Sequence, residues 1–212
     1  RTDEAEMGRG HMNGYQEAEL AFSRNGYAWH RAAPGQAFLP HGGAGAWDRG
    51  NLQCASQPVL LDDEIRYYYA GTDMRHQRHW ELEPQRAGLG LARLRPDGFV
   101  ALCADRPAEL LTVAFVPAGP RLFVNADVDR QGELRLALLD PEGRPLPGFG
   151  ERECQPLHGD ALDHPVRWTG REALPVGQPL RLRVRAAGAR LYSIYLTVPE
   201  ERPVYHRFGA LA

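Results

Sequence analysis

The sequence contains no lysine, and all 25 of its basic residues are arginine. Because Ala, Gly and Pro are also abundant, this bias indicates a GC-rich genome rather than a demand for the bidentate carboxylate binding that Arg alone provides. With 27 acidic residues the net charge is −2, so no basic excess points to nucleic acid or to an anionic membrane surface as a partner. The length of 212 residues suits one large domain or two modest ones.

Several other signals are missing. No apolar run is long enough to cross a bilayer as a helix. The three cysteines, Cys54, Cys103 and Cys154, form no CxxC pair, which argues against a zinc or redox motif. Free thiols in a reducing compartment are favoured over a single disulfide, so the expected location is cytoplasmic. The GxSxG, P-loop and GxGxxG patterns are absent as well.

Helix signals are nearly absent, and short apolar runs alternate with Gly, Pro, Asp and Asn. The stretch QPVLLDDEIRYYYAG predicts two strands joined at Asp62-Asp63. The stretch GLGLARLRPDGFVAL predicts a hairpin that turns at Pro96-Asp97-Gly98. Short strands separated by turn signals about every ten residues predict an all-β fold.

The character of the sequence changes near residues 103–109. Residues 108–198 predict an antiparallel β-sandwich built from strands of six to eight residues. In PLRLRVRA, for example, Leu182 and Val184 alternate with Arg181 and Arg183, as in a strand with one face in solvent. The tail 199–212 is interrupted by proline and predicts irregular structure.

The stretch AFSRNGYAWHR, residues 21–31, predicts a tight hairpin. Its Asn25-Gly26 pair is typical of two-residue turns in which both residues take positive φ. Ser23 can cap this turn, and Trp29 can cover it. The pattern resembles the S-x-D-G-x-x-W blade turn of five-bladed propeller glycoside hydrolases, with Asn25 in place of Asp.

The order of the following segments resembles the last blades of glycoside hydrolase families 32 and 43. A second pattern, D-x-x-G-x-x-x-P-G-F, then Cys, G-D and V-x-W, resembles the β-sandwich appended to such propellers in bacterial proteins. It is filled by Asp140, Gly143, Pro147, Gly148, Phe149, Cys154, Gly159, Asp160, Val166 and Trp168. A blade takes about 40–50 residues. The resemblance therefore implies about two terminal propeller blades in residues 1–107, followed by the sandwich domain.

The elements that carry the catalytic acids of these families, W-M-N-D-P-N-G, R-D-P and E-C-P, do not occur in the blade region. The resemblance therefore implies the C-terminal portion of a glycosidase-like protein without its main catalytic carboxylates. Its partners would be carbohydrate and either an N-terminal propeller fragment or another copy of the chain. A non-catalytic carbohydrate-binding or structural module is the alternative.

Candidate substrate-binding residues lie in the loops and strand ends of the blade region. Asp48 and Asp73 sit where a blade could present a carboxylate, although a turn-capping role is favoured because such turns are common. The pair His76-x-x-His79 suits a metal only on a helix, and none is signalled, so an aromatic-tipped loop near a sugar is favoured. The full set of candidates is Trp47, Asp48, Gln53, Asp73, His76 and Trp80.

Two further expectations concern single side chains. Tyr67, Tyr68 and Tyr69 are consecutive, so alternation places Tyr68 on the face opposite to the other two. In NADVDRQGE, Asp127 and Asp129 could hold Ca²⁺, but the segment lacks the EF-hand pattern and a plain acidic turn is favoured. No other metal or cofactor is expected.

Overall fold

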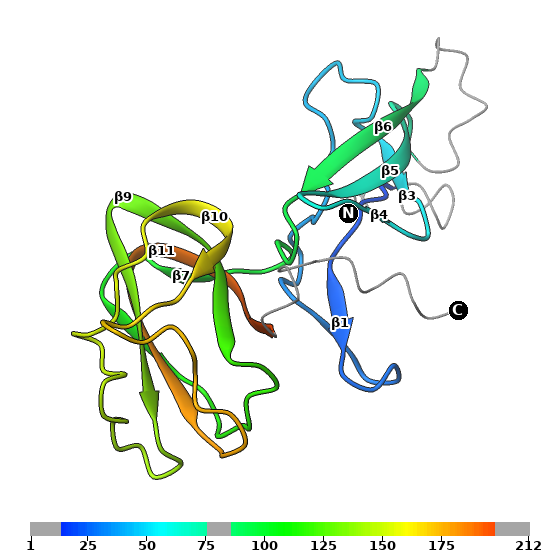
Figure 1. Ribbon diagram of the computed structural model, residues 1–212. Helices are drawn as coiled ribbons and strands as arrows, with labels where there is room; N and C mark the ends of the chain where they lie inside the picture. Colours follow the sequence, from blue (N-terminus) through cyan, green and yellow to red (C-terminus); the bar gives the residue numbers. More distant parts are fainter. Residues whose placement is uncertain (1–13, 76–85, 198–212) are drawn as a thin grey trace. The chain divides into compact units, whose positions relative to one another are not determined.

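The structure is a computed structural model that describes residues 14–75 and 86–197 (Figure 1). All regular elements in these residues are β-strands, so the predicted all-β class is confirmed. The chain divides into two compact units, Arg1–Arg95 and Pro96–Ala212. This division falls before the predicted boundary at 107, because strand β7 (Leu102–Ala104) pairs with β11 (Arg181–Thr197) of the second unit.

The described residues of the first unit form two sheets. Strands β1 (Ala21–Ser23) and β2 (Trp29–Arg31) form a hairpin. In the second sheet β5 (Ile65–Thr72) is central. Strands β3 (Asn51–Cys54) and β4 (Val59–Leu60) pair with different parts of β5, and β6 (Ala87–Leu94) pairs with its whole length. The predicted hairpin around Asp62-Asp63 is confirmed by the pairing of β4 with β5.

The side chains of β5 alternate between the two faces of its sheet. We call the more buried face the inner face and the more exposed one the outer face. Tyr67 and Tyr69 lie half-buried on the inner face, whereas Tyr68 is exposed on the outer face. The predicted split of the three tyrosines is therefore confirmed, because side chains alternate along a strand.

The predicted hairpin around Pro96-Asp97-Gly98 is wrong. A turn does form there, with Asp97 at a φ of 57°. The strand before it, β6, pairs with β5, and the strand after it, β7, pairs with β11. The turn residues determine a local change of direction, but the choice of neighbouring strand depends on which partner offers a matching length and apolar face.

In residues 96–197 the second unit forms a five-stranded sheet that curls around its core (Figure 1). Its order is β10 (Gly159–Pro165), β9 (Arg121–Leu139), β11 and β7, and β8 (Ala108–Leu111) also pairs with β11. The expectation of strands of six to eight residues is wrong for β9 and β11, which have 19 and 17 residues. Asp127 and Asp129 therefore lie within β9 rather than in a separate loop between two strands.

The two long strands bend where glycines bring their backbones close together. Ala187 pairs with Glu133 and Ala189 with Val128, so one residue of β11 faces four residues of β9. At this bulge Gly188 takes a φ of 57°. A Cβ atom on Gly132 would lie only 2.4 Å from the carbonyl oxygen of Gly188. Glycine permits this contact, and the sheet curls as a result.

The core of the second unit contains most of the apolar residues of the D-x-x-G-x-x-x-P-G-F pattern. Phe149 meets Trp168 edge to face at 5.3 Å, and the indole nitrogen of Trp168 donates a hydrogen bond of 3.1 Å to the carbonyl of Leu136. The Cys154 sulfur accepts a hydrogen bond from the Leu136 amide. Because these side chains are buried, the sequence pattern reflects how the core of this unit packs and does not mark a binding site.

Candidate functional site

Trp47 and Asp48 lie in the loop before β3 and pack on the inner face of the β5–β6 pair. The ring of Trp47 stacks on Tyr69 at 5.8 Å with an interplanar angle of 10°. The Tyr69 hydroxyl donates a hydrogen bond of 2.9 Å to Oδ2 of Asp48, whose exposed fraction is 9%. Burial, together with this hydrogen bond, raises the pKa of Tyr69 above its ordinary value. The structure thus brings two predicted site residues together through Tyr69, which the sequence analysis did not select.

Glycines on the two strands make room for this cluster. A Cβ on Gly71 would lie 2.8 Å from atoms of both Trp47 and Asp48, and one on Gly90 would lie 2.2 Å from the Tyr69 ring. Gly88 also faces the indole ring. The glycine spacing in GLGLARL is the sequence signal for aromatic rings packed on this face. The arrangement therefore holds Asp48 inside the unit rather than presenting it to a substrate.

Asp73 closes the end of the β5–β6 hairpin. Its Oδ1 accepts a hydrogen bond of 3.0 Å from the Arg86 backbone amide, and its Oδ2 accepts one of 3.2 Å from the Arg86 guanidinium. The backbone hydrogen bond is the largest cause that lowers the pKa of Asp73, and the guanidinium adds to it. A carboxylate held ionised in this way can join the ends of the two strands, but it does not suit the role of a general acid, which needs a raised pKa.

Among the other predicted site residues that the structure describes, Gln53 does not join the Trp47–Asp48 cluster. Gln53 lies on β3 opposite Ala70 and is exposed on the outer face. His76 and Trp80 fall outside the described residues. The structure therefore supports one buried cluster rather than a single polar site.

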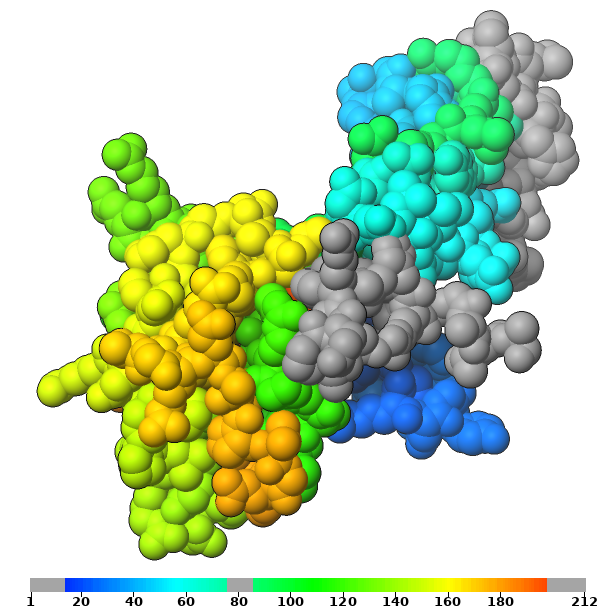
Figure 2. All heavy atoms as spheres, in the orientation of Figure 1, coloured from blue at the N-terminus to red at the C-terminus, as the bar shows by residue number. Residues whose placement is uncertain are grey.

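The β1–β2 hairpin presents aromatic side chains that the sequence analysis did not place in a binding site. Tyr27 is 92% exposed and Trp29 is 63% exposed. The indole nitrogen of Trp29 donates a hydrogen bond of 3.1 Å to the carbonyl of Gly26, which fixes the ring while its surface remains open. The hairpin is the blue segment beside the β1 label in Figure 1 and appears at the surface in Figure 2.

Side-chain hydrogen bonds hold the loop of this hairpin. Ser23 Oγ accepts a hydrogen bond of 2.9 Å from the Gly26 amide, which confirms the predicted cap. The two-residue Asn-Gly turn is wrong, because Ser23 pairs with Trp29 and five residues separate them. Only Gly26 takes positive φ, while Asn25 acts through its side chain by accepting bonds of 2.9 Å from the amides of Tyr27 and Ala28.

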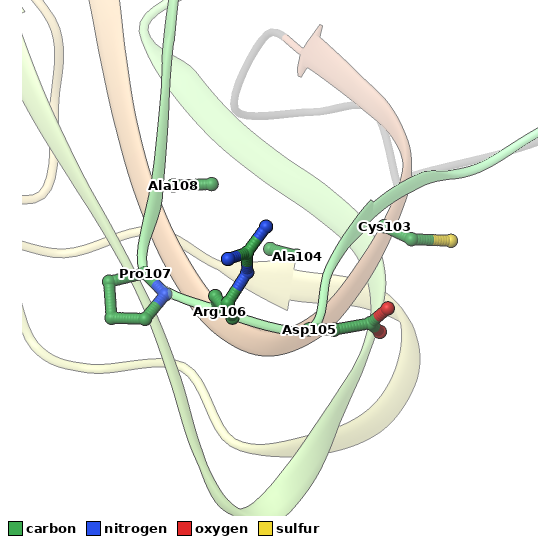
Figure 3. A pocket seen from close by; sticks show the side chains of 6 residues that line it. All are labelled: Cys103, Ala104, Asp105, Arg106, Pro107 and Ala108. Carbon is green, nitrogen blue, oxygen red and sulfur yellow. The ribbon is translucent and has the colours of Figure 1, made fainter.

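The second unit has an open hollow of about 400 Å³ lined by residues 103–108. Figure 3 shows the Arg106 side chain extending between Ala104 and Ala108, while Cys103 and Asp105 point to another side. The lining contains one carboxylate, that of Asp105. Hydrolysis of a glycosidic bond canonically uses two facing carboxyl groups, so this hollow does not supply that chemistry.

Asp127, for which the sequence favours an acidic turn over a Ca²⁺ site, is engaged in the sheet. Its Oδ2 forms an ion pair of 3.1 Å with Arg190, the residue directly opposite on β11. Within residues 14–75 and 86–197, no three His, Cys, Asp or Glu side chains gather closely enough to hold a metal ion. The same residues contain no helix that could cross a membrane.

Comparison of the chain with protein-family models, with curated proteins and with solved structures gives no match.

Proposed function

We propose that this chain is the C-terminal portion of a glycoside hydrolase-like protein and that it serves as a carbohydrate-binding part without the main catalytic carboxylates. The exposed aromatic surface formed by Tyr27 and Trp29 carries the proposal. Sugar rings present partly apolar C–H faces, and a fixed, open indole is suited to stack on them. The resemblance of this hairpin to the blade turn of propeller glycosidases supports the same substrate class.

The surroundings of Asp48 and Asp73 favour binding over catalysis. Asp48 is buried against Tyr69, and Asp73 is bound to Arg86. Neither is arranged as the acid of a glycosidase, which acts with a raised pKa. In this proposal, the catalytic groups belong to an N-terminal propeller fragment, which lies upstream in the same protein or on a partner chain. The thiols of Cys54, Cys103 and Cys154 are free, which is compatible with a reducing compartment. The proposed location is therefore the cytoplasm of a bacterium.

Calorimetric titration with a panel of oligosaccharides and soluble polysaccharides tests the proposal. We expect at least one glycan to bind, and Trp29→Ala to weaken that binding about tenfold or more, as expected for a central aromatic contact. Trp29→Phe keeps a ring and should retain more affinity than Trp29→Ala. Tyr68→Ala, an exposed aromatic on another sheet, is the matched control and should bind normally.

Two results would contradict the proposal: no glycan in the panel binds, or Trp29→Ala binds as tightly as the unaltered chain. An assay with chromogenic glycosides separates binding from catalysis. We expect no turnover of a glycoside by this chain alone. If the chain does hydrolyse a glycoside and Asp48→Asn abolishes that activity, Asp48 is a catalytic residue instead.

A further inference from the structure

The eight-residue strand β6 has an unpaired edge within the described part of the chain. It pairs with β5 through eight consecutive residue pairs, and none of the described strands lies on its other side (Figure 1). Natural proteins usually protect such an edge with charged residues, proline, a bulge or a very short strand. β6, whose sequence is AGLGLARL, has no proline and an unbroken register with β5, and its single charged residue, Arg93, lies next to its end.

The hydrogen-bond pattern identifies the backbone groups on this edge. The Asp73 amide donates to the carbonyl of Arg86, so the backbone of residue 86 faces β5. Backbone direction alternates along an antiparallel strand. Residues 88, 90 and 92 therefore also face β5. The amide and carbonyl groups of Ala87, Leu89, Leu91 and Arg93 point to the unpaired edge.

Three of these four residues, all but Arg93, carry apolar side chains. Leu89 is 85% exposed, and Leu91 is exposed beside Tyr68, its direct partner on β5. On the opposite face Gly88 and Gly90 carry no side chain beyond hydrogen. A strand that added to β6 would therefore satisfy four amides and four carbonyls and would cover the leucines.

The edge is complementary to itself. The four outward residues are symmetric about Gly90, so two antiparallel copies of β6 centred there would place Ala87 opposite Arg93 and Leu89 opposite Leu91. Every outward amide would then meet an outward carbonyl, and the leucines of both copies would form one apolar patch. The two Arg93 side chains would lie at opposite ends of the pairing, so no like charges would face each other directly.

We propose that a second copy of this chain docks on β6, forming a two-fold β6–β6 ribbon centred on Gly90. The pairing joins the sheet that contains β6 in one copy to the same sheet in the other copy, which gives one continuous sheet across the dimer. This interface rests on the geometry of β6 alone and holds whether or not the chain binds carbohydrate.

Sedimentation and light scattering of the full chain over a wide concentration range test the interface. We expect a monomer–dimer equilibrium, and Leu89→Lys should weaken dimerisation about tenfold or more, because it removes two central apolar contacts and places charge at the edge. Val113→Lys is the matched control, since Val113 is 79% exposed in the second unit, and it should dimerise normally. A chain that stays monomeric at every concentration overturns the proposal, as does a dimer that Leu89→Lys leaves intact.

The register has a test of its own at Ala87, which is exposed. Ala87→Glu places a carboxylate opposite Arg93 of the second copy twice in each dimer and should tighten dimerisation about 2- to 30-fold. Ala87→Arg places like charges there and should weaken it by a similar factor. Circular dichroism confirms that both variants fold. If both substitutions shift the equilibrium in the same direction, the register centred on Gly90 is wrong.

Discussion

The hydroxyl of Tyr69 donates a hydrogen bond of 2.9 Å to Oδ2 of Asp48, joining a strand residue to a loop residue 21 positions earlier in the chain. The same phenol ring stacks on Trp47, the neighbour of Asp48. One side chain therefore fixes both the apolar and the polar part of the loop against the sheet. This relationship makes Asp48 a structural residue of the first unit.

Tyr69→Phe should lower the free energy of unfolding of the first unit by about 1–3 kcal/mol, because it leaves the buried Asp48 carboxylate without its hydroxyl partner. Urea unfolding followed by tryptophan fluorescence measures the loss. Tyr27→Phe is the control, since Tyr27 is almost fully exposed and its hydroxyl should contribute little. Equal stability of Tyr69→Phe and the unaltered chain would show that Asp48 does not depend on this bond.

The contribution of Asp73 should depend on pH. Hydrogen bonds from Arg86 lower the pKa of Asp73 below its ordinary value of 3.8. The native state therefore favours the ionised form, and the resulting stability is present above pH 3.8 and lost as the pH falls through the lowered pKa.

Asp73→Asn tests this prediction by removing the charge at all pH values. Unfolding measured across a pH series should show the variant less stable than the unaltered chain near neutrality. The difference should shrink as the pH falls below 3.8. A difference that grows toward acid would contradict the assigned direction of the pKa shift.

Gly132→Ala should destabilise the second unit. The new Cβ would lie 2.4 Å from the carbonyl oxygen of Gly188 and 2.6 Å from that of Ala187, and neither backbone atom can move without shifting β11. We expect a loss of about 1–3 kcal/mol, the usual cost of overpacking. Gly43→Ala is the control, because a Cβ there meets nothing within 4 Å. Thermal unfolding compares the two, and a neutral Gly132→Ala would refute the close approach of β9 and β11.

Thiol labelling should divide the three cysteines. Cys103 and Cys54 are exposed and should react with an aromatic disulfide reagent in the native protein, whereas the buried Cys154 should react only after unfolding. Burial raises the pKa of the Cys54 and Cys154 thiols, which lowers their thiolate fraction near neutrality. Cys154, which is also buried, should therefore react last. Mass spectrometry identifies the labelled sites, and rapid labelling of Cys154 in the folded chain would contradict its place in the core.

The sequence by itself determined the features that depend on near neighbours along the chain. Alternation placed Leu182 and Val184 in the core and turned Tyr68 away from Tyr69, because successive side chains of a strand point to opposite faces. Ser23 capped its turn as expected, since its hydroxyl needs only an amide three residues away. Residue type and short spacing are sufficient for such features.

Only the tertiary structure decided which distant segments meet. It paired β7 with β11, extended β9 through the segment expected to be a separate turn, and gave Asp48 and Asp73 their partners Tyr69 and Arg86. These contacts are set by burial of apolar faces and by the need to satisfy buried polar groups across long chain separations. The local pattern at Asp48 is the same for a capping and a catalytic carboxylate, so its surroundings alone distinguish the two.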